Sequence, residues 1–183
     1  NVVPTLVSLL KCRDSTTQDF CSAALCSLSW QKSSQDRFVK QGGLRAIIAC
    51  AQSDNVDMQR MCSACLSNFS CDEESQNWIV SDGGLTAIID LVGSEETETS
   101  QRAVLALRNL SFYERNRPLM VRKRCVRSLI KVAVNSSSDD SEDEDIADKK
   151  VTLGTLDMTV LKNIAVALCN LSLHVPNKSR MVE

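Results

Sequence analysis

One five-residue pattern recurs four times in this chain and limits what the chain can fold into. It consists of a leucine, a variable residue, an asparagine or serine, an apolar residue and a serine. Its copies are Leu25-Cys26-Ser27-Leu28-Ser29, Leu66-Ser67-Asn68-Phe69-Ser70, Leu107-Arg108-Asn109-Leu110-Ser111 and Leu168-Cys169-Asn170-Leu171-Ser172. The copies are 41, 41 and 61 residues apart. Regular steps of this size are typical of solenoids, in which each repeat buries its apolar face against the next one.

The sequence between two copies has the periodicity of helices. A short polar segment is followed by a glycine pair, the pattern Leu-x-Ala-Ile-Ile, a polar break and a long apolar-periodic stretch. Apolar residues recur at the spacing of amphipathic helices, and the residues that open the middle helix keep the 41-residue step at Val3, Leu44, Leu85 and Val126. We therefore expect an all-α solenoid of about four repeats, at about 1–41, 42–82, 83–123 and 124–183, the last including the start of a fifth. Because the first and last repeats are incomplete, we expect a fragment of a longer array.

The apolar spacing also predicts which residues face the core. In the first long helix, which we expect to end near Trp30, the predicted buried stripe is Phe20, Cys21, Ala24, Leu25 and Leu28. Cys62 and Cys65 have the spacing of half a zinc site, but no second cysteine pair lies at a suitable distance. In the other copies the position of Cys62 holds Cys21, Ala103 and Ile164, and that of Cys65 holds Ala24, Ala106 and Ala167. We therefore interpret both cysteines as small core residues.

The 61-residue step contains an insertion of unusual composition. Residues at about 135–155 include three consecutive serines and a dense run of aspartate and glutamate, with almost no apolar residues. Such a segment cannot bury enough surface to offset the entropy of ordering it, so we expect a disordered acidic insertion. Ser136, Ser137 and Ser141 each have an acidic residue three positions later, which predicts phosphorylation by an acidophilic kinase.

Composition excludes several classes of function. A formal net charge of −2 gives the chain no overall attraction to nucleic acid, and the basic block at 115–131 has the apolar spacing of a packed helix pair. The single histidine, His174, leaves no serine or cysteine triad, and no glycine-rich phosphate loop is present. We therefore expect no enzymatic activity, no cofactor or metal, no small-molecule substrate and no nucleic-acid partner.

Cysteine usage and hydropathy bear on localisation. The nine cysteines are an odd number scattered through helical patterns, unlike the disulfide framework of a secreted domain. No run of 18 apolar residues is present, so no membrane span is predicted. We expect an intracellular protein, cytoplasmic and/or nuclear.

The repeat unit, with its glycine pair, Leu-x-Ala-Ile-Ile and closing Ala-Leu-x-Asn-Leu-Ser, resembles the armadillo repeat. The resemblance extends over nearly the whole chain apart from the acidic insertion. It implies three helices per repeat, stacked in a right-handed superhelix, with the third helices lining a concave groove that binds extended peptides. In relatives such as importin alpha and beta-catenin the asparagine of the third helix holds the ligand backbone, so the resemblance implies that role for Asn68, Asn109 and Asn170. The first copy departs from the pattern with Ser27.

Charged residues share this face of the long helices. Eight residues before each reference position lie Asp19, Arg60, Gln101 and Lys162, and Arg102 and Arg108 flank the third copy. We therefore predict a peptide-binding groove that contains Asn68, Asn109, Asn170, Arg60, Gln101, Arg102, Arg108 and Lys162. Its mixed, mildly basic character favours an acidic or phosphorylated peptide over a basic one.

One departure from the family bears on the partner. Importin alpha carries a tryptophan four residues before the asparagine, and this chain has Ala23, Ala64, Leu105 and Val166 there. The predicted function is a protein-interaction scaffold or adaptor. The alternatives are a fragment of a nuclear transport receptor, which the missing tryptophans disfavour, and the substrate-recognition region of a larger enzyme such as an armadillo-bearing ubiquitin ligase.

Overall fold

The computed structural model describes residues 2–134 and 157–182, and every regular element in these ranges is a helix. The helices are α1 Val2–Leu9, α2 Ser15–Ser29, α3 Lys32–Lys40, α4 Gly43–Cys50, α5 Val56–Phe69, α6 Glu73–Ser81, α7 Gly84–Val92, α8 Thr97–Ser111, η1 Glu114–Asn116, α9 Arg117–Arg122, α10 Cys125–Val134, α11 Met158–Leu173 and α12 Val175–Val182. The predicted acidic insertion and its serines at 136, 137 and 141 lie outside the described residues.

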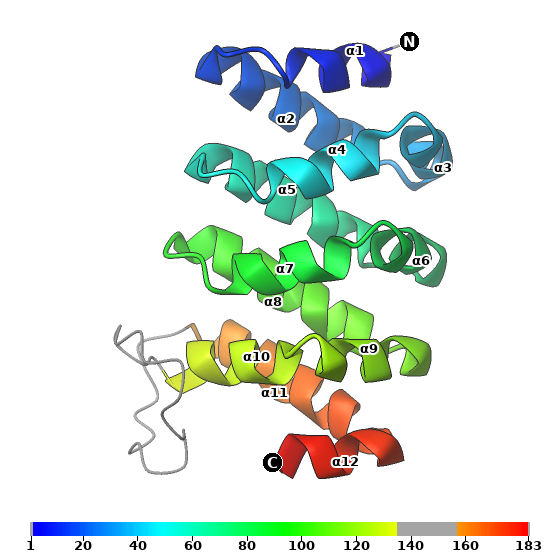
Figure 1. Ribbon diagram of the computed structural model, residues 1–183, viewed down its shortest axis with the longest axis vertical. Helices are drawn as coiled ribbons and strands as arrows, with labels where there is room; N and C mark the ends of the chain where they lie inside the picture. The colour runs from blue at the N-terminus through cyan, green and yellow to red at the C-terminus, as the bar shows by residue number, and fades with distance from the viewer. Residues whose placement is uncertain (1, 135–156, 183) are drawn as a thin grey trace.

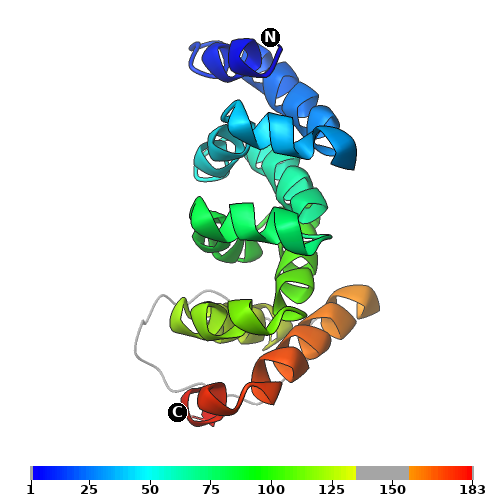
Figure 2. The same cartoon turned by 90° about the vertical axis from the view of Figure 1, so that its right-hand side faces the viewer.

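The helices form three rows that follow the long axis of the molecule (Figure 1). The long helices α2, α5, α8 and α11 pack against one another in that order. The helices α1, α4, α7 and α10 form a second row that packs on the first, and α3, α6, α9 and α12 lie along the edge. Seen from the side, the long helices line one face of the stack (Figure 2). The prediction of an all-α solenoid is therefore confirmed.

Polar residues in the breaks between helices determine where the long helices begin. Asp14 accepts a hydrogen bond from the Thr17 backbone N–H at 2.7 Å, and Asn55 accepts one from Met58 at 2.9 Å. Glu96 does the same for Thr99 at 2.6 Å. Each of these side chains satisfies a backbone N–H that has no partner within its own helix. The polar break therefore caps the long helix.

The turn between the edge helix and the middle helix requires a left-handed backbone. Gly42 and Gly83, which stand 41 residues apart, have φ of +82° and +83°. The following glycines are needed for a different reason: a Cβ on Gly43 would lie 2.5 Å from the Phe38 ring. At the corresponding position of the next repeat the chain has Arg124, with φ of 61°. This arginine occupies a conformation that costs a residue with a Cβ about 1–2 kcal/mol.

Replacing Arg124 by glycine is expected to stabilise the fold by about 0.5–1 kcal/mol. The change relieves the left-handed strain of about 1–2 kcal/mol, but it also adds about 0.5–1 kcal/mol of chain entropy to the unfolded state. Urea unfolding of the two proteins measures the difference. The neighbouring Lys123→Gly is the control, because Lys123 has φ of −85° and glycine there should lower stability. A lower stability of Arg124→Gly would contradict the strain argument.

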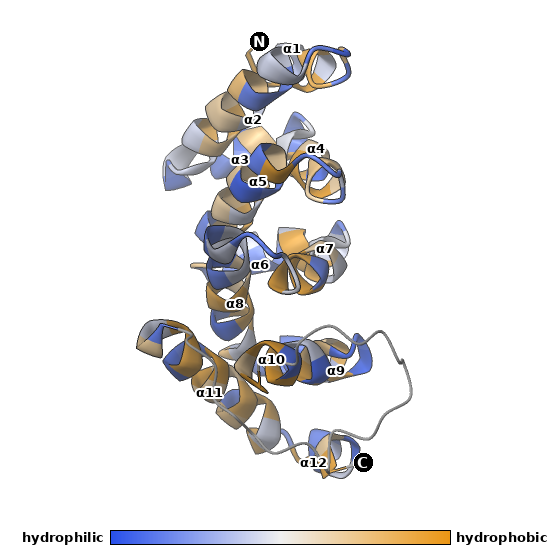
Figure 3. Ribbon diagram, turned by 90° about the vertical axis from the view of Figure 1, so that its left-hand side faces the viewer, coloured by the Kyte–Doolittle hydropathy of each residue, from blue (hydrophilic) through white to orange (hydrophobic). Residues whose placement is uncertain are grey.

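The core is continuous from repeat to repeat. Leu25, Leu66, Leu107 and Leu171 are each 0% exposed, and they lie on the long helices that contact one another. Figure 3 shows hydrophobic and hydrophilic residues alternating along these helices, the pattern of helices buried on one side. Because each helix packs between its two neighbours, the array has one core rather than several.

The core prediction for the first long helix needs one correction. Cys21 and Leu25 are buried as expected, but Phe20 is 73% exposed and Leu28 is 38% exposed. Phe20 is seven residues before Ser27, two helical turns away, and so lies on the same face as the reference position. That face carries the predicted groove, so the Phe20 side chain points to solvent and not into the core.

Candidate functional site

Two of the three predicted asparagines, Asn109 and Asn170, form direct links between neighbouring repeats. The Asn109 side-chain N–H donates to the Ser70 hydroxyl at 3.0 Å, and Asn170 donates to the Ser111 hydroxyl at 3.0 Å. Each serine belongs to the same five-residue pattern in the preceding repeat. Part of each amide is therefore used to hold the stack together. We call Asn68, Asn109 and Asn170 the asparagine ladder.

The ladder retains hydrogen-bonding capacity for a ligand. An asparagine side chain offers two N–H donors and an oxygen with two lone pairs. In Asn109 one N–H is bound to Ser70, and the oxygen accepts one bond from Arg108 at 3.4 Å. One N–H and one lone pair remain, and the side chain is partly exposed. This is the donor and acceptor pair that an extended peptide backbone presents.

The first two reference positions of the repeat, Ser27 and Asn68, have surroundings that differ from those of Asn109. Asn68 is also partly exposed, and its side-chain amide makes no hydrogen bond to any described residue. Ser27, which replaces asparagine in the first copy, is exposed. The ladder is therefore continuous from Asn68 to Asn170 and stops before α2.

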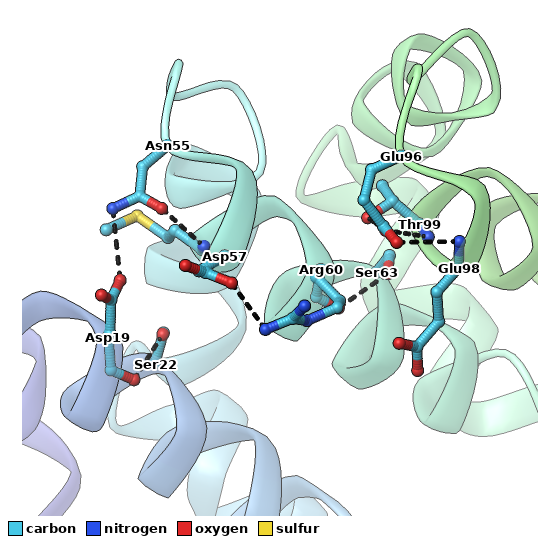
Figure 4. Close-up of polar contacts among 10 residues, drawn as sticks. Asp19, Ser22, Asn55, Asp57, Arg60, Ser63, Glu96, Glu98 and Thr99 are labelled. Carbon is cyan, nitrogen blue, oxygen red and sulfur yellow. Dashed lines mark hydrogen bonds and ion pairs between the residues drawn. The ribbon is translucent and has the colours of Figure 1, made fainter.

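Two of the predicted groove arginines, Arg60 and Arg102, pair with carboxylates near the N-terminal ends of their long helices; Figure 4 shows the pair that Arg60 forms. Arg60 pairs with Asp57 at 2.6 Å, and Arg102 pairs with Glu98 at 2.7 Å. Hydrogen bonds from Thr99 lower the pKa of Glu96, and the nearby Arg60 charge lowers it further. Each arginine is therefore neutralised by its own helix, and this end of the groove is not basic.

The other predicted groove residues have different surroundings. Lys162 is exposed and forms no ion pair with a described residue. Gln101 lines a cleft of about 590 Å³ between α7, α8 and α10, to which Asp90 and Lys131 also contribute. Burial raises the pKa of Asp90. The cleft lies at the start of α8, away from the C-terminal end of the helix, where Asn109 is found.

Arg108 lies at the C-terminal end of α8 and has no carboxylate partner among the described residues. Its guanidinium carbon lies 5.2 Å from the centroid of the Phe112 ring, within cation–π distance. Its Nε is buried and has no hydrogen-bond partner within the described part of the chain. Buried polar groups without a partner are rare in folded proteins and call for a physical explanation.

An apolar row follows the asparagine ladder, and the sequence reasoning missed it. Three residues after each reference position stand Trp30, Cys71, Phe112 and Leu173. Trp30 is 75% exposed, Phe112 50% and Leu173 62%. A spacing of three residues places each of them beside its ladder position. The signal in the sequence is the repeat spacing itself, which places these four residues in register three positions after the reference residues.

A second set of side-chain amides is buried near the C-terminal ends of the long helices. Gln35, Gln76, Asn116 and Asn177 each donate to a backbone carbonyl near the end of the preceding long helix, at 2.9, 2.8, 3.1 and 3.2 Å. Asn116 also donates to the Gln76 side-chain oxygen at 2.8 Å, and Ser75 donates to that of Gln35 at 2.8 Å. We call these four residues the buried amide row. It joins neighbouring repeats, and it is closed to ligands.

The cysteines and acidic residues of the described chain do not cluster as metal ligands. Residues 2–134 and 157–182 contain no group of three His, Cys, Asp or Glu side chains that could hold a metal ion. Cys62 and Cys65 are 0% exposed, as expected of core residues, and burial raises the pKa of Cys65.

No single described helix is long and apolar enough to span a membrane. The helices α11 and α12 together meet the length and composition criteria, but the chain bends by 118° between them.

Comparison with known proteins identifies the fold. No protein-family model and no curated protein sequence matches this chain. Among solved structures, a designed armadillo repeat protein matches 98% of this chain and 69% of its own length, at 15% identity and a TM-score of 0.76. The chain has an armadillo-type fold. An engineered protein matches 100% of the chain and 67% of its own length, at 24% identity and a TM-score of 0.75.

A further armadillo structure was solved with a ligand. It is a designed armadillo repeat protein in complex with the peptide (KR)4, and it matches 98% of this chain and 69% of its own length, at 14% identity and a TM-score of 0.77. TM-scores of 0.75–0.77 establish the armadillo-type fold of this chain. At identities of 14–24% the comparison says nothing of its surface chemistry, which depends on the residues of this chain.

Proposed function

We propose that this chain is a protein-interaction scaffold that binds an extended segment of a partner along the asparagine ladder. The observation that carries the proposal is the unused hydrogen-bonding capacity of Asn68 and Asn109 on an exposed face. A regular series of amides suits a peptide backbone, because an extended backbone repeats its N–H and C=O groups at regular intervals. The designed armadillo protein in complex with (KR)4 supports a peptide as the class of ligand.

The charge of the ligand is the finer part of this proposal. Arg108 and Lys162 are the predicted groove cations that lack a carboxylate partner among the described residues, and both lie on the ladder side of their helices. The positions four residues before the ladder hold Ala23, Ala64, Leu105 and Val166, which offer no aromatic ring to stack on a basic side chain. An acidic segment fits this groove better than a basic one.

The experiment is a selection of random twelve-residue peptides on the purified protein, followed by affinity measurements on the selected peptides. The triple variant Asn68→Ala, Asn109→Ala, Asn170→Ala is expected to bind them at least about tenfold more weakly. Three backbone hydrogen bonds, each with a net contribution of about 0.5–1.5 kcal/mol, correspond to a change of this size or larger. Fluorescence anisotropy of labelled peptides measures it.

A matched control separates the ligand role of the amides from their structural role. The double variant Ser70→Ala, Ser111→Ala removes the acceptors of the inter-repeat bonds but keeps every asparagine. It should keep peptide affinity within about threefold, because each such bond contributes only about 0.5–1.5 kcal/mol to the fold. Equal peptide affinity of the wild type and the triple asparagine variant would overturn the proposal.

A further inference from the structure

The third repeat carries a cation, Arg108, that has no carboxylate partner in residues 2–134 and 157–182. At the position of Arg108 the other repeats have Cys26, Ser67 and Cys169, so only this repeat places a charge directly before the ladder residue. The guanidinium is held between the Phe112 ring and the Asn109 oxygen, at 5.2 Å and 3.4 Å respectively. Stacking and one long hydrogen bond fix its orientation but do not neutralise its charge.

Two neighbouring arginines, Arg102 and Arg115, each form an ion pair with a carboxylate. Arg102 donates two hydrogen bonds to a single Glu98 oxygen, Oε1, from Nε at 3.0 Å and from Nη2 at 2.7 Å. Arg115, which lies 6.0 Å from the Tyr113 ring, pairs with Glu73 at 3.2 Å. A carboxylate ligand would give Arg108 the charged partner that these two arginines already have, and hydrogen bonds between a guanidinium and a carboxylate are stronger than those between neutral groups.

The surface beside Arg108 is apolar. Phe112 is half exposed at the next turn, and its backbone N–H donates to the Asn109 carbonyl, which keeps ring and ladder residue adjacent. Trp30 and Leu173 occupy the same repeat position two repeats before and one repeat after it. Exposed aromatic rings near an unpaired charge are typical of interaction sites rather than of solvated surface.

Two other classes of partner fit this surface less well. A nucleic acid is bound by neutralising several phosphates, and here the ladder is flanked by one unpaired arginine with Lys162 on the next long helix. A membrane requires a continuous apolar face. In the apolar row the small side chain of Cys71 separates the large ones of Trp30 and Phe112, and the polar residues Asn68, Asn109 and Asn170 lie beside the row. A peptide can satisfy amide, apolar and charged groups at once.

We propose that Arg108 and Phe112 form the specificity-determining subsite of the groove, which selects a peptide segment with a carboxylate side chain next to an apolar one. The carboxylate pairs with the Arg108 guanidinium, and the apolar side chain packs on Phe112. The ladder holds the backbone between them. This inference rests on the proposed peptide-binding function. It adds which side chains of the peptide the groove recognises.

The test compares peptides selected by different variants from one random twelve-residue library. The wild type should enrich adjacent pairs of an apolar residue and Asp or Glu about tenfold over the starting library, since a hydrogen bond to a charged group contributes about 1.5–3 kcal/mol. Selection on Arg108→Gln should lose the acidic enrichment, and selection on Phe112→Ser should lose the apolar one. Replacing the selected carboxylate by an amide should weaken binding about tenfold on the wild type and about twofold or less on Arg108→Gln.

Two controls match these changes in chemistry but lie outside the subsite. Arg115→Gln changes an arginine that also lies beside a ring but already has a carboxylate partner, and Leu9→Ser changes an exposed apolar residue on α1. Both should select the wild-type peptides. If Arg108→Gln and Phe112→Ser select them too, the subsite is wrong, although the peptide-binding function stands if the triple asparagine variant loses them. Enrichment of basic peptides also overturns the subsite, and the absence of any selected peptide overturns both proposals.

Discussion

Phe69→Ala is expected to lower the free energy of unfolding by about 3–5 kcal/mol. Phe69 is 0% exposed and lies in the last turn of α5, where its ring packs against those of Phe38 at 5.7 Å and Trp78 at 6.4 Å. These rings come from α3 and α6, the edge helices on either side of it. Truncating a buried phenylalanine removes its transfer free energy and leaves a cavity that the surroundings fill only in part. Urea unfolding followed by circular dichroism measures the loss.

The matched control is Phe20→Ala, which makes the same chemical change on an exposed side chain. Because Phe20 is 73% exposed, its removal should change stability by less than about 0.5 kcal/mol. A loss below about 1 kcal/mol in Phe69→Ala would show that the aromatic cluster does not connect these repeats. A loss that appears only in part of the unfolding transition would place the cluster at a weak point of the array.

Gln76→Met is expected to lower stability by about 2–4 kcal/mol, although the two side chains have similar length. Gln76 is 0% exposed and donates to the backbone carbonyls of Ser70 and Asn109, at 2.8 and 3.2 Å. Its oxygen accepts from Asn116 at 2.8 Å. Methionine makes none of these bonds, so the Ser70 carbonyl and one Asn116 side-chain N–H lose their Gln76 partner inside the core, at about 1–3 kcal/mol for each group, whereas the Asn109 carbonyl keeps its bond from the Phe112 N–H. Thermal and urea unfolding both measure the effect.

Gln52→Met provides the comparison for the buried amide row, because Gln52 is exposed and the same substitution there should be close to neutral. The Gln76 result also bears on the groove. The carbonyl that Gln76 binds belongs to Asn109, a ladder residue. If Gln76→Met is as stable as the wild type, the buried amide row does not contribute to repeat stacking.

The spacing of the repeat was enough to predict the helices and the positions of the ladder. A 41-residue period and an apolar stripe depend only on local propensity and on which face must be buried, and both can be counted in a sequence. Phe20 shows the limit of this reasoning. The apolar spacing predicted a core residue, whereas the superhelix turns that face of α2 toward solvent.

The sequence predicted which residues belong to the candidate site, but it could not predict which of its charged side chains form ion pairs. Arg60, Arg102 and Arg108 look alike in the sequence as flanking cations. Only the structure separates the two that pair with Asp57 and Glu98 from the one that stacks on Phe112 without a carboxylate. Which partner a long charged side chain reaches depends on rotamers and on neighbouring helices, and the repeat spacing carries no information about either.

The sequence by itself determined the all-α repeat architecture, because the period of its apolar residues permits no other way to bury them. Only the tertiary structure decided which polar groups remain free for a ligand. Asn109 and Gln76 both carry side-chain amides and both occupy repeated positions. Asn109 keeps an unused N–H at the surface, whereas the N–H groups of Gln76 donate to buried backbone carbonyls. Hydrogen-bond partners come from helices that are distant in sequence, so packing determines which amides bind a partner and which hold the stack together.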